Sequence, residues 1–261
     1  MGQALSLFWL DVQLKLKRAL AFRVNFALNV LGSLFFSFVL AAFQFFVYAG
    51  VEGYPGWSAQ QLLLFQAVLV LWTGLCDFLF GGIRQLIDLE VTRGSFDRFF
   101  LWPPHPLVSL LTRGSNVYAL ASVLAGLAGV TVMWRRLGLT PTPLMLLLGA
   151  FCFLCGLLLY VALLIVYCAC TLFWVKMERL REVLDRVVFF GSFPADVYLG
   201  PGRTGLLVCF PIALWVHLPV QALLGRAPLS ALGAALCSGL VFVLSLGFWR
   251  RQQRLYTSAG G

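Results

Sequence analysis

Long apolar runs separated by short charged segments dominate the pattern of this chain. A helix of about 20 apolar residues crosses a hydrocarbon core about 30 Å thick. Uncharged runs of sufficient length cover residues 24–51, 114–134, 137–175, 204–225 and 227–249. A further run over residues 58–82 is interrupted only by Asp77. The pattern predicts an all-α membrane protein.

Six transmembrane helices in a single domain over residues 1–261 fit these runs best. We expect an amphipathic helix at residues 1–22, an inner-face segment at 83–113, and spans at about 24–49, 58–82, 114–134, 143–174, 183–225 and 228–249. The fifth region is too long for one helix and contains four prolines. Irregular backbone persists at membrane depth only where protein or a water-filled cavity covers it, so we expect a broken fifth span. In the alternative arrangement, Thr204–Gly225 is itself the fifth span.

The basic residues orient these spans. In a six-span topology, most of the 19 Lys and Arg residues lie on one side of the membrane. Those on the other side are Arg135, Arg136, Arg203 and Arg226. Under the positive-inside rule, both chain termini are then cytoplasmic. The net charge of +9 follows from this asymmetry and requires no nucleic-acid partner.

Composition limits the classes of function that remain. The chain is 61% hydrophobic and only 11% charged, whereas soluble domains contain about 25% charged residues. There is no room for a sizeable aqueous domain, and therefore none for a soluble enzyme beside the helices.

The cysteine and histidine residues do not form a recognisable metal or nucleophile site. Cys152, Cys155, Cys168 and Cys170 lie in one apolar run without histidine or acidic partners, and a structural zinc site needs four ligands held together. We interpret these cysteines as core-filling residues. His217 is interpreted as a packing histidine, and no metal or cofactor is expected in this chain.

Polar residues inside the apolar runs are candidates for a substrate path. One stripe of the first expected span carries, at every fourth position, Asn25, Asn29, Ser33 and Ser37. These side chains either line a path or join neighbouring helices, where small and hydrogen-bonding residues are common. Asp77 is the acid that lies well inside an expected span. It is either functional or the structural partner of Arg84.

The segment "EVTRGSFDRFFLWPPHPL", residues 90–107, forms a charged and proline-rich elbow between the second and third spans. Its prolines prevent a continuous helix, and Gly94 permits a turn. Four aromatic residues flank Asp97 and Arg98. Such a segment is suited to docking on a partner or lying on lipid; alternatively it only connects two spans.

The first 22 residues have the pattern of an amphipathic helix. Leu7, Leu10 and Leu14 share one face, whereas Asp11 and Lys15 lie on another. This arrangement predicts a helix along the inner membrane surface.

Four stretches of the chain resemble a permease subunit of the type-2 class of ABC transporters, in the branch of small six-span permeases. They are "RVNFALNVLGSLFF", "GYPGWSAQQLLLFQ", "VTRGSFDRFFLWPPHPL" and "FGSFPADVYLGPGRTGLLVCFPIALWVHLPVQALLG". The third resembles the family pattern Gly-x-Leu-Asp-x-x-Leu-x-x-Pro, although Phe96 stands where that pattern usually has leucine.

The resemblance implies a type-2 ABC exporter-like fold with re-entrant helices on the outer side before the last span. It also implies that the elbow sits in a cleft of an ATP-binding subunit. The residues expected to form this coupling contact are Arg93, Gly94, Phe96, Asp97, Arg98 and Pro103. The sequence has no G-x-x-x-x-G-K-[ST] phosphate-binding loop, so ATP and Mg²⁺ are expected on two copies of a partner ATPase.

On this interpretation the chain is a non-catalytic permease in the bacterial inner membrane. It is expected to contact membrane lipid, to pair with a second permease that is identical or related, and to export or flip its substrate. The alternatives are a secondary transporter, an intramembrane enzyme, or a membrane scaffold without ATPase coupling. The chain shows no clear inverted repeat and no paired acids or histidines at mid-span, which argues against the first two.

Overall fold

The structure is a computed structural model that describes residues 2–50, 54, 56–102, 105–140, 142–174, 178–198, 200, 202, 205, 210–226 and 230–256. All regular elements in this part of the chain are helical. They are α1 (Gly2–Ala21), α2 (Arg23–Gly50), α3 (Ala59–Phe80), α4 (Ile83–Thr92), α5 (Arg98–Leu101), α6 (Pro106–Arg113), η1 (Val117–Ala119), α7 (Leu120–Arg136), α8 (Pro143–Trp174), α9 (Glu178–Gly191), η2 (Ala195–Val197), η4 (Ile212–Leu214), α11 (His217–Leu223) and α12 (Ser230–Leu255).

Five helical stretches in the described residues are long and apolar enough to cross a membrane. They cover residues 23–48, 59–92, 117–136, 143–174 and 230–255. These stretches match five of the six expected spans, and the second continues through α4. The protein is therefore a multi-pass, all-helical membrane protein.

The expected fifth span is not a single helix in this structure. Helix α9 has 14 residues and is about 21 Å long at 1.5 Å per residue, which is short of a hydrocarbon core of about 30 Å. The short elements η2, η4 and α11 follow it. The described part of the alternative span Thr204–Gly225 is also interrupted, because residues 210–216 carry a bend and a 3-10 helix.

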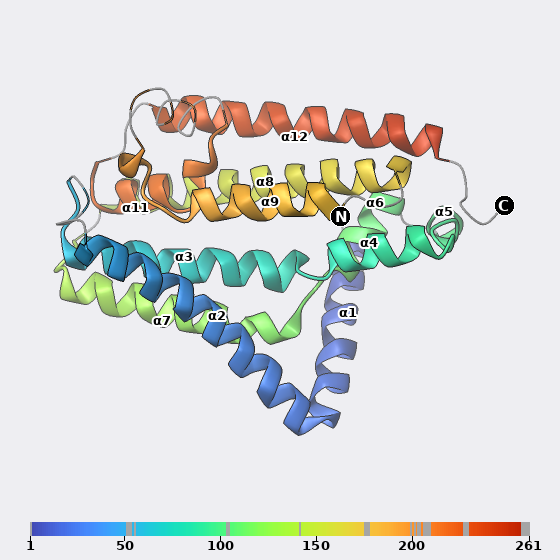
Figure 1. Cartoon of the computed structure of the whole chain (residues 1–261), viewed down its shortest axis with the longest axis horizontal. Coiled ribbons are helices and arrows are strands. Elements are labelled where there is room, and N and C mark those ends of the chain that lie inside the picture. Colours follow the sequence, from blue (N-terminus) through green and yellow to red (C-terminus); the bar gives the residue numbers. More distant parts are fainter. Residues whose placement is uncertain are drawn as a thin grey trace.

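Helices α8 and α12 run in the same direction, so the chain between them must return along the bundle (Figure 1). Near their beginnings, Cys152 and Ala234 share one apolar cluster, and near their ends Tyr167 and Trp249 share another. Helix α9 begins this return alongside α8. The topology therefore requires a return segment, since α8 and α12 both start at the same end of the bundle.

Protein covers the irregular part of the return. Every residue from 211 to 222 is buried. The Trp215 ring stacks on Trp72 of α3 with centroids 4.7 Å apart. Gly156 of α8 and Gly191 of α9 leave room for this segment, because an added Cβ would lie 2.6 Å from the Leu214 oxygen and 2.4 Å from the Trp215 ring, respectively. Burial against three helices satisfies the requirement for irregular backbone at membrane depth.

Helices α3 and α7 form an antiparallel pair whose backbones approach closely. A Cβ added to Gly74 would lie 2.9 Å from the Val123 backbone nitrogen, and one added to Gly126 would lie 2.4 Å from that of Leu71. Small residues at such crossings allow van der Waals contact between membrane helices.

Helices α1 and α2 form a V at the edge of the bundle (Figure 1). The helix expected at residues 1–22 is present as α1. Its expected apolar stripe faces away from the protein, with Leu10 and Leu14 more than half exposed. A second face, including Val12 and Ala19, packs on η1. Lys15 Nζ donates to the backbone oxygens of Arg113 (2.6 Å) and Ser115 (2.9 Å), which fixes α1 to the chain that precedes η1.

Candidate functional site

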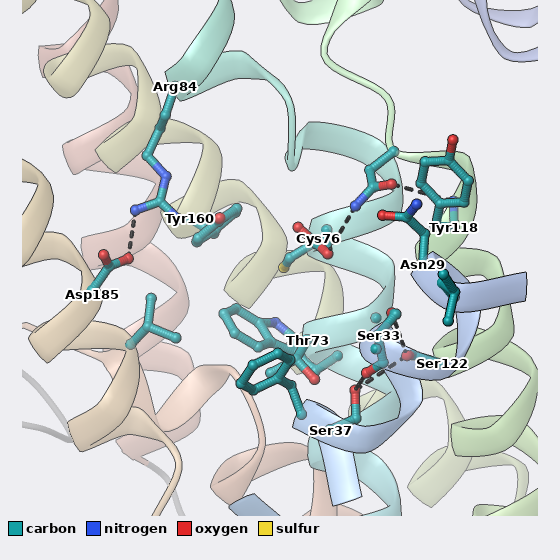
Figure 2. A pocket seen from close by; sticks show the side chains of 18 residues that line it. Asn29, Ser33, Ser37, Thr73, Cys76, Arg84, Tyr118, Ser122, Tyr160 and Asp185 are labelled. Carbon is teal, nitrogen blue, oxygen red and sulfur yellow. Dashed lines mark hydrogen bonds and ion pairs between the residues drawn. The ribbon is translucent and has the colours of Figure 1, made fainter. Parts of the chain in front are cut away.

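A polar cavity of about 490 Å³ opens between α2, α3, α7, α8 and α9 (Figure 2). Its walls carry hydroxyl, amide, carboxylate and guanidinium groups as well as aromatic rings. The residues that line it are Leu28, Asn29, Gly32, Ser33, Phe36, Ser37, Trp72, Thr73, Gly74, Cys76, Asp77, Arg84, Asn116, Tyr118, Ser122, Tyr160, Asp185 and Val188.

The serines of the α2 stripe meet Ser122 of α7 on one side of the cavity (Figure 2). Ser122 Oγ lies 3.0 Å from Ser33 Oγ and accepts a hydrogen bond from Ser37 Oγ at 3.1 Å. These hydroxyls therefore join α2 to α7, which is the packing role that the sequence suggested as one alternative. They also line the cavity.

Asn25 is hydrogen-bonded to Asn29 but does not line the same cavity as the other members of the stripe. Its backbone and side-chain oxygens accept hydrogen bonds from Asn29 Nδ2, at 2.7 and 3.0 Å. It lines a neighbouring hollow of about 720 Å³ together with basic residues, including Lys15 and Arg113. Asn116 lines both hollows. Four of the five residues expected on a substrate path thus border one cavity, and Asn25 borders the adjoining one.

Asp77 and Arg84 both line the cavity, but Arg84 pairs elsewhere. Its Nη1 forms an ion pair with Asp185 Oδ1 of α9 at 2.5 Å. Asp77 is exposed, and its Oδ2 accepts a hydrogen bond from Asn116 Nδ2 at 3.1 Å. The local pair considered for Asp77 and Arg84 is thus replaced by two separate contacts to distant parts of the chain.

Three polar residues that border the cavity were not expected there from the sequence: Asn116, Ser122 and Asp185. Ser122 lies in an expected span, and Asn116 lies close to its start, so each could have been considered as a polar group near membrane depth. Asp185 belongs to a segment with several charges. Only the return of α9 along the bundle identifies which of those charges faces the cavity.

The elbow is a folded unit at the opposite end of the bundle from α11 (Figure 1). Gly94 has a positive φ of 63°, a conformation that favours glycine, and it turns the chain between α4 and α5. Phe96 and Phe99 are fully buried, with ring centroids 4.9 Å apart. Tyr256, after α12, contacts Phe96 at a centroid distance of 5.7 Å. The buried phenylalanines thus belong to the apolar cluster that also contains Tyr167 of α8 and Trp249 of α12, which joins the elbow to the bundle.

The other residues expected to couple the chain to a partner differ in their surroundings. Arg93 and Asp97 are exposed, and Leu101, at the end of α5, is 83% exposed. Arg98 forms an ion pair with the buried Glu90. Pro103 lies outside the described residues. The surface that the elbow presents therefore combines charged side chains with two exposed apolar side chains, Phe100 and Leu101.

Arg113, the last residue of α6, contacts an aromatic ring of the elbow. Its guanidinium lies 3.6 Å from the centroid of the Trp102 ring, a cation–π arrangement. Burial beside the rings lowers the pKa of Arg113, Arg98 lowers it further, and Asp11 and Glu90 raise it.

Comparison with models of known protein families shows the family of this chain. A model of the family described as "ABC-2 family transporter protein" matches residues 28–260. The chain belongs to the ABC-2 transporter family. The resemblance to a type-2 ABC permease, drawn from its motifs, is thereby confirmed. A comparison with curated proteins finds no significant match.

Membership of the ABC-2 family identifies a transmembrane permease component of an ABC transporter. Such components are generally non-catalytic and work with ABC ATPase subunits. In the part of this ABC-2 protein that the structure describes, no three His, Cys, Asp or Glu side chains gather in an arrangement able to hold a metal ion.

Proposed function

We propose that this ABC-2 protein is the permease subunit of an ATP-driven transporter that exports or flips a substrate across the bacterial inner membrane. A separate ATPase would bind ATP and Mg²⁺ and couple its closure to the helices through the elbow. Both chain termini would be cytoplasmic, as the distribution of Lys and Arg favours.

The observation that carries this proposal is the elbow's construction. It combines a buried aromatic core with an exposed leucine, Leu101, and the exposed charges of Arg93 and Asp97. A stiff element with an apolar anchor and charges that set its register meets the physical demands of a coupling contact. Gly94 and Phe96 would act by shaping the element, and Arg98 by holding it against Glu90.

The polar cavity between the helices is the candidate for the substrate path. Its walls come from helices in distant parts of the chain, so a small shift of α9 or α2 would change its shape. We propose that Asn29, Ser33, Ser37 and Asp77 face the substrate there, and that Asn25 borders its inner end. Two ATPase copies and a second permease, identical or related, would complete the transporter.

The test is co-purification of the chain with its ATPase, together with transport-linked ATP hydrolysis. Asp97→Arg should reverse a register-setting charge, and Leu101→Asp should remove the apolar anchor. Both variants should insert normally but lose the ATPase or hydrolyse ATP without transport. Thr140→Asp, an exposed residue near the turn between α7 and α8, is the control and should behave as wild type. Normal assembly and coupling in both elbow variants would make the elbow a connector only.

A further inference from the structure

The charges around the cavity do not cancel. Its ionisable side chains are Cys76, Asp77, Arg84, Tyr118, Tyr160 and Asp185. Arg84 is the single basic side chain among the described residues that line it, and Asp185 compensates this charge at 2.5 Å. Asp77 has a neutral amide as its hydrogen-bond partner. Ionised, Asp77 leaves the cavity with one uncompensated negative charge.

A hydrogen bond from Asn116 orients the Asp77 carboxylate. The Asn116 side chain accepts the Tyr118 backbone N–H through Oδ1 at 3.2 Å, which leaves its Nδ2 to donate to Asp77. The other carboxylate oxygen lies over Gly81, where an added Cβ would be only 2.2 Å away. The carboxylate is thus oriented before any ligand binds.

Aromatic rings border the same cavity. Tyr160 packs edge-on against Trp72 with centroids 5.5 Å apart, and Phe36 and Tyr118 line other parts of the wall. Aromatic faces attract cations, most strongly where water is excluded. The volume of about 490 Å³ falls within the range of about 300–1,000 Å³ that is usual for small-molecule sites.

We propose that the cavity binds an amphipathic organic cation, with Asp77 as its counter-charge and the aromatic wall as the surface for its apolar groups. This inference rests on the proposed permease function, because it names the class of substrate for that cavity. An exposed carboxylate at membrane depth is costly unless a partner offsets its charge, and a bound cation would supply that partner.

The test uses the intact transporter in lipid nanodiscs and two probes of the same shape and opposite charge, tetraphenylphosphonium and tetraphenylborate. Wild type should bind the phosphonium cation more tightly than the borate anion, after subtraction of binding to empty nanodiscs. Asp77→Asn should weaken phosphonium binding by about tenfold or more, the loss expected for one partly desolvated charge pair. Asp77→Glu should retain part of the preference for the cation.

The matched control is Glu182→Gln, which removes one negative charge from an exposed residue of α9 that does not line the cavity and should leave probe binding unchanged. Asp77→Asn should still co-purify with the ATPase, whereas loss of the ATPase from wild type would count against the permease function and not against cation binding. Equal binding of the two probes, or phosphonium binding that Asp77→Asn does not weaken, would overturn the proposal.

Discussion

Glu90 and Arg98 form an ion pair that folds the elbow back onto the end of α4. The Glu90 side chain is only 6% exposed, and its second oxygen accepts a hydrogen bond from Ser95 Oγ at 2.7 Å. A buried carboxylate that loses its partners is strongly unfavourable. Arg98, expected from the sequence to contact an ATPase, therefore has a partner within its own chain.

We predict that Glu90→Gln loosens the elbow without unfolding the bundle. The loss should be about 1 kcal/mol, because Arg98 is half exposed and its ion pair is partly screened. Amide hydrogen exchange over residues 93–102 of the intact transporter should become about fivefold faster. Arg135→Gln, on an exposed residue near the end of α7, is the control. Unchanged exchange in Glu90→Gln would show that the ion pair does not hold the elbow.

The α3–α7 crossing should not tolerate a side chain at Gly126. Gly126→Ala places a methyl group 2.4 Å from the Leu71 nitrogen and should cost about 1–3 kcal/mol through overpacking. The unfolding temperature of the purified protein should fall by about 2–4 °C for each kcal/mol.

Gly247→Ala in α12 is the matched control for this crossing, because an added Cβ there has no atom within 4 Å. Alanine is a better helix former than glycine, so this variant should be neutral or slightly more stable. If both variants had the same unfolding temperature, the close α3–α7 approach would be incorrect.

We predict that His217→Ala destabilises the segment after α9. His217 is buried, and its Nδ1 accepts the Ala195 backbone N–H at 3.2 Å. Removing it leaves a buried donor unsatisfied and an unfilled volume, at a cost of about 2–3 kcal/mol. Thermal unfolding should show this loss, whereas Thr131→Ala, on an exposed face, should unfold as wild type does.

Single-cysteine labelling should establish which end of the bundle is cytoplasmic. In a cysteine-free background, Leu101→Cys should react with a membrane-impermeant maleimide in inside-out vesicles, and Thr140→Cys in right-side-out vesicles. Both positions are exposed, so accessibility depends on the side of the membrane. The reverse labelling pattern would contradict the orientation inferred from the basic residues.

Much of the helical arrangement could be predicted from the sequence, using the positions of glycine, aromatic and apolar residues. Five of the six expected spans correspond to helices, because a run of about 20 mostly apolar residues has few alternatives to a membrane helix. The N-terminal helix was predictable from its separate apolar and charged faces. The elbow could also be predicted, since its prolines, its charges and Gly94 lie between two apolar runs. The family resemblance was readable from the same segments.

Tertiary structure decided which polar groups meet. From the sequence, Asp77 was either functional or the partner of the nearby Arg84, but the return of α9 brings Asp185 to Arg84. Phe96 and Arg98 read as surface residues of the elbow, yet Phe99, Tyr256 and Glu90 enclose or hold them. The length of an apolar run determines that a helix crosses the membrane. The rotation of that helix and its neighbours depend on close contacts, such as Gly126 against Leu71. Those contacts fix which side chains face the cavity.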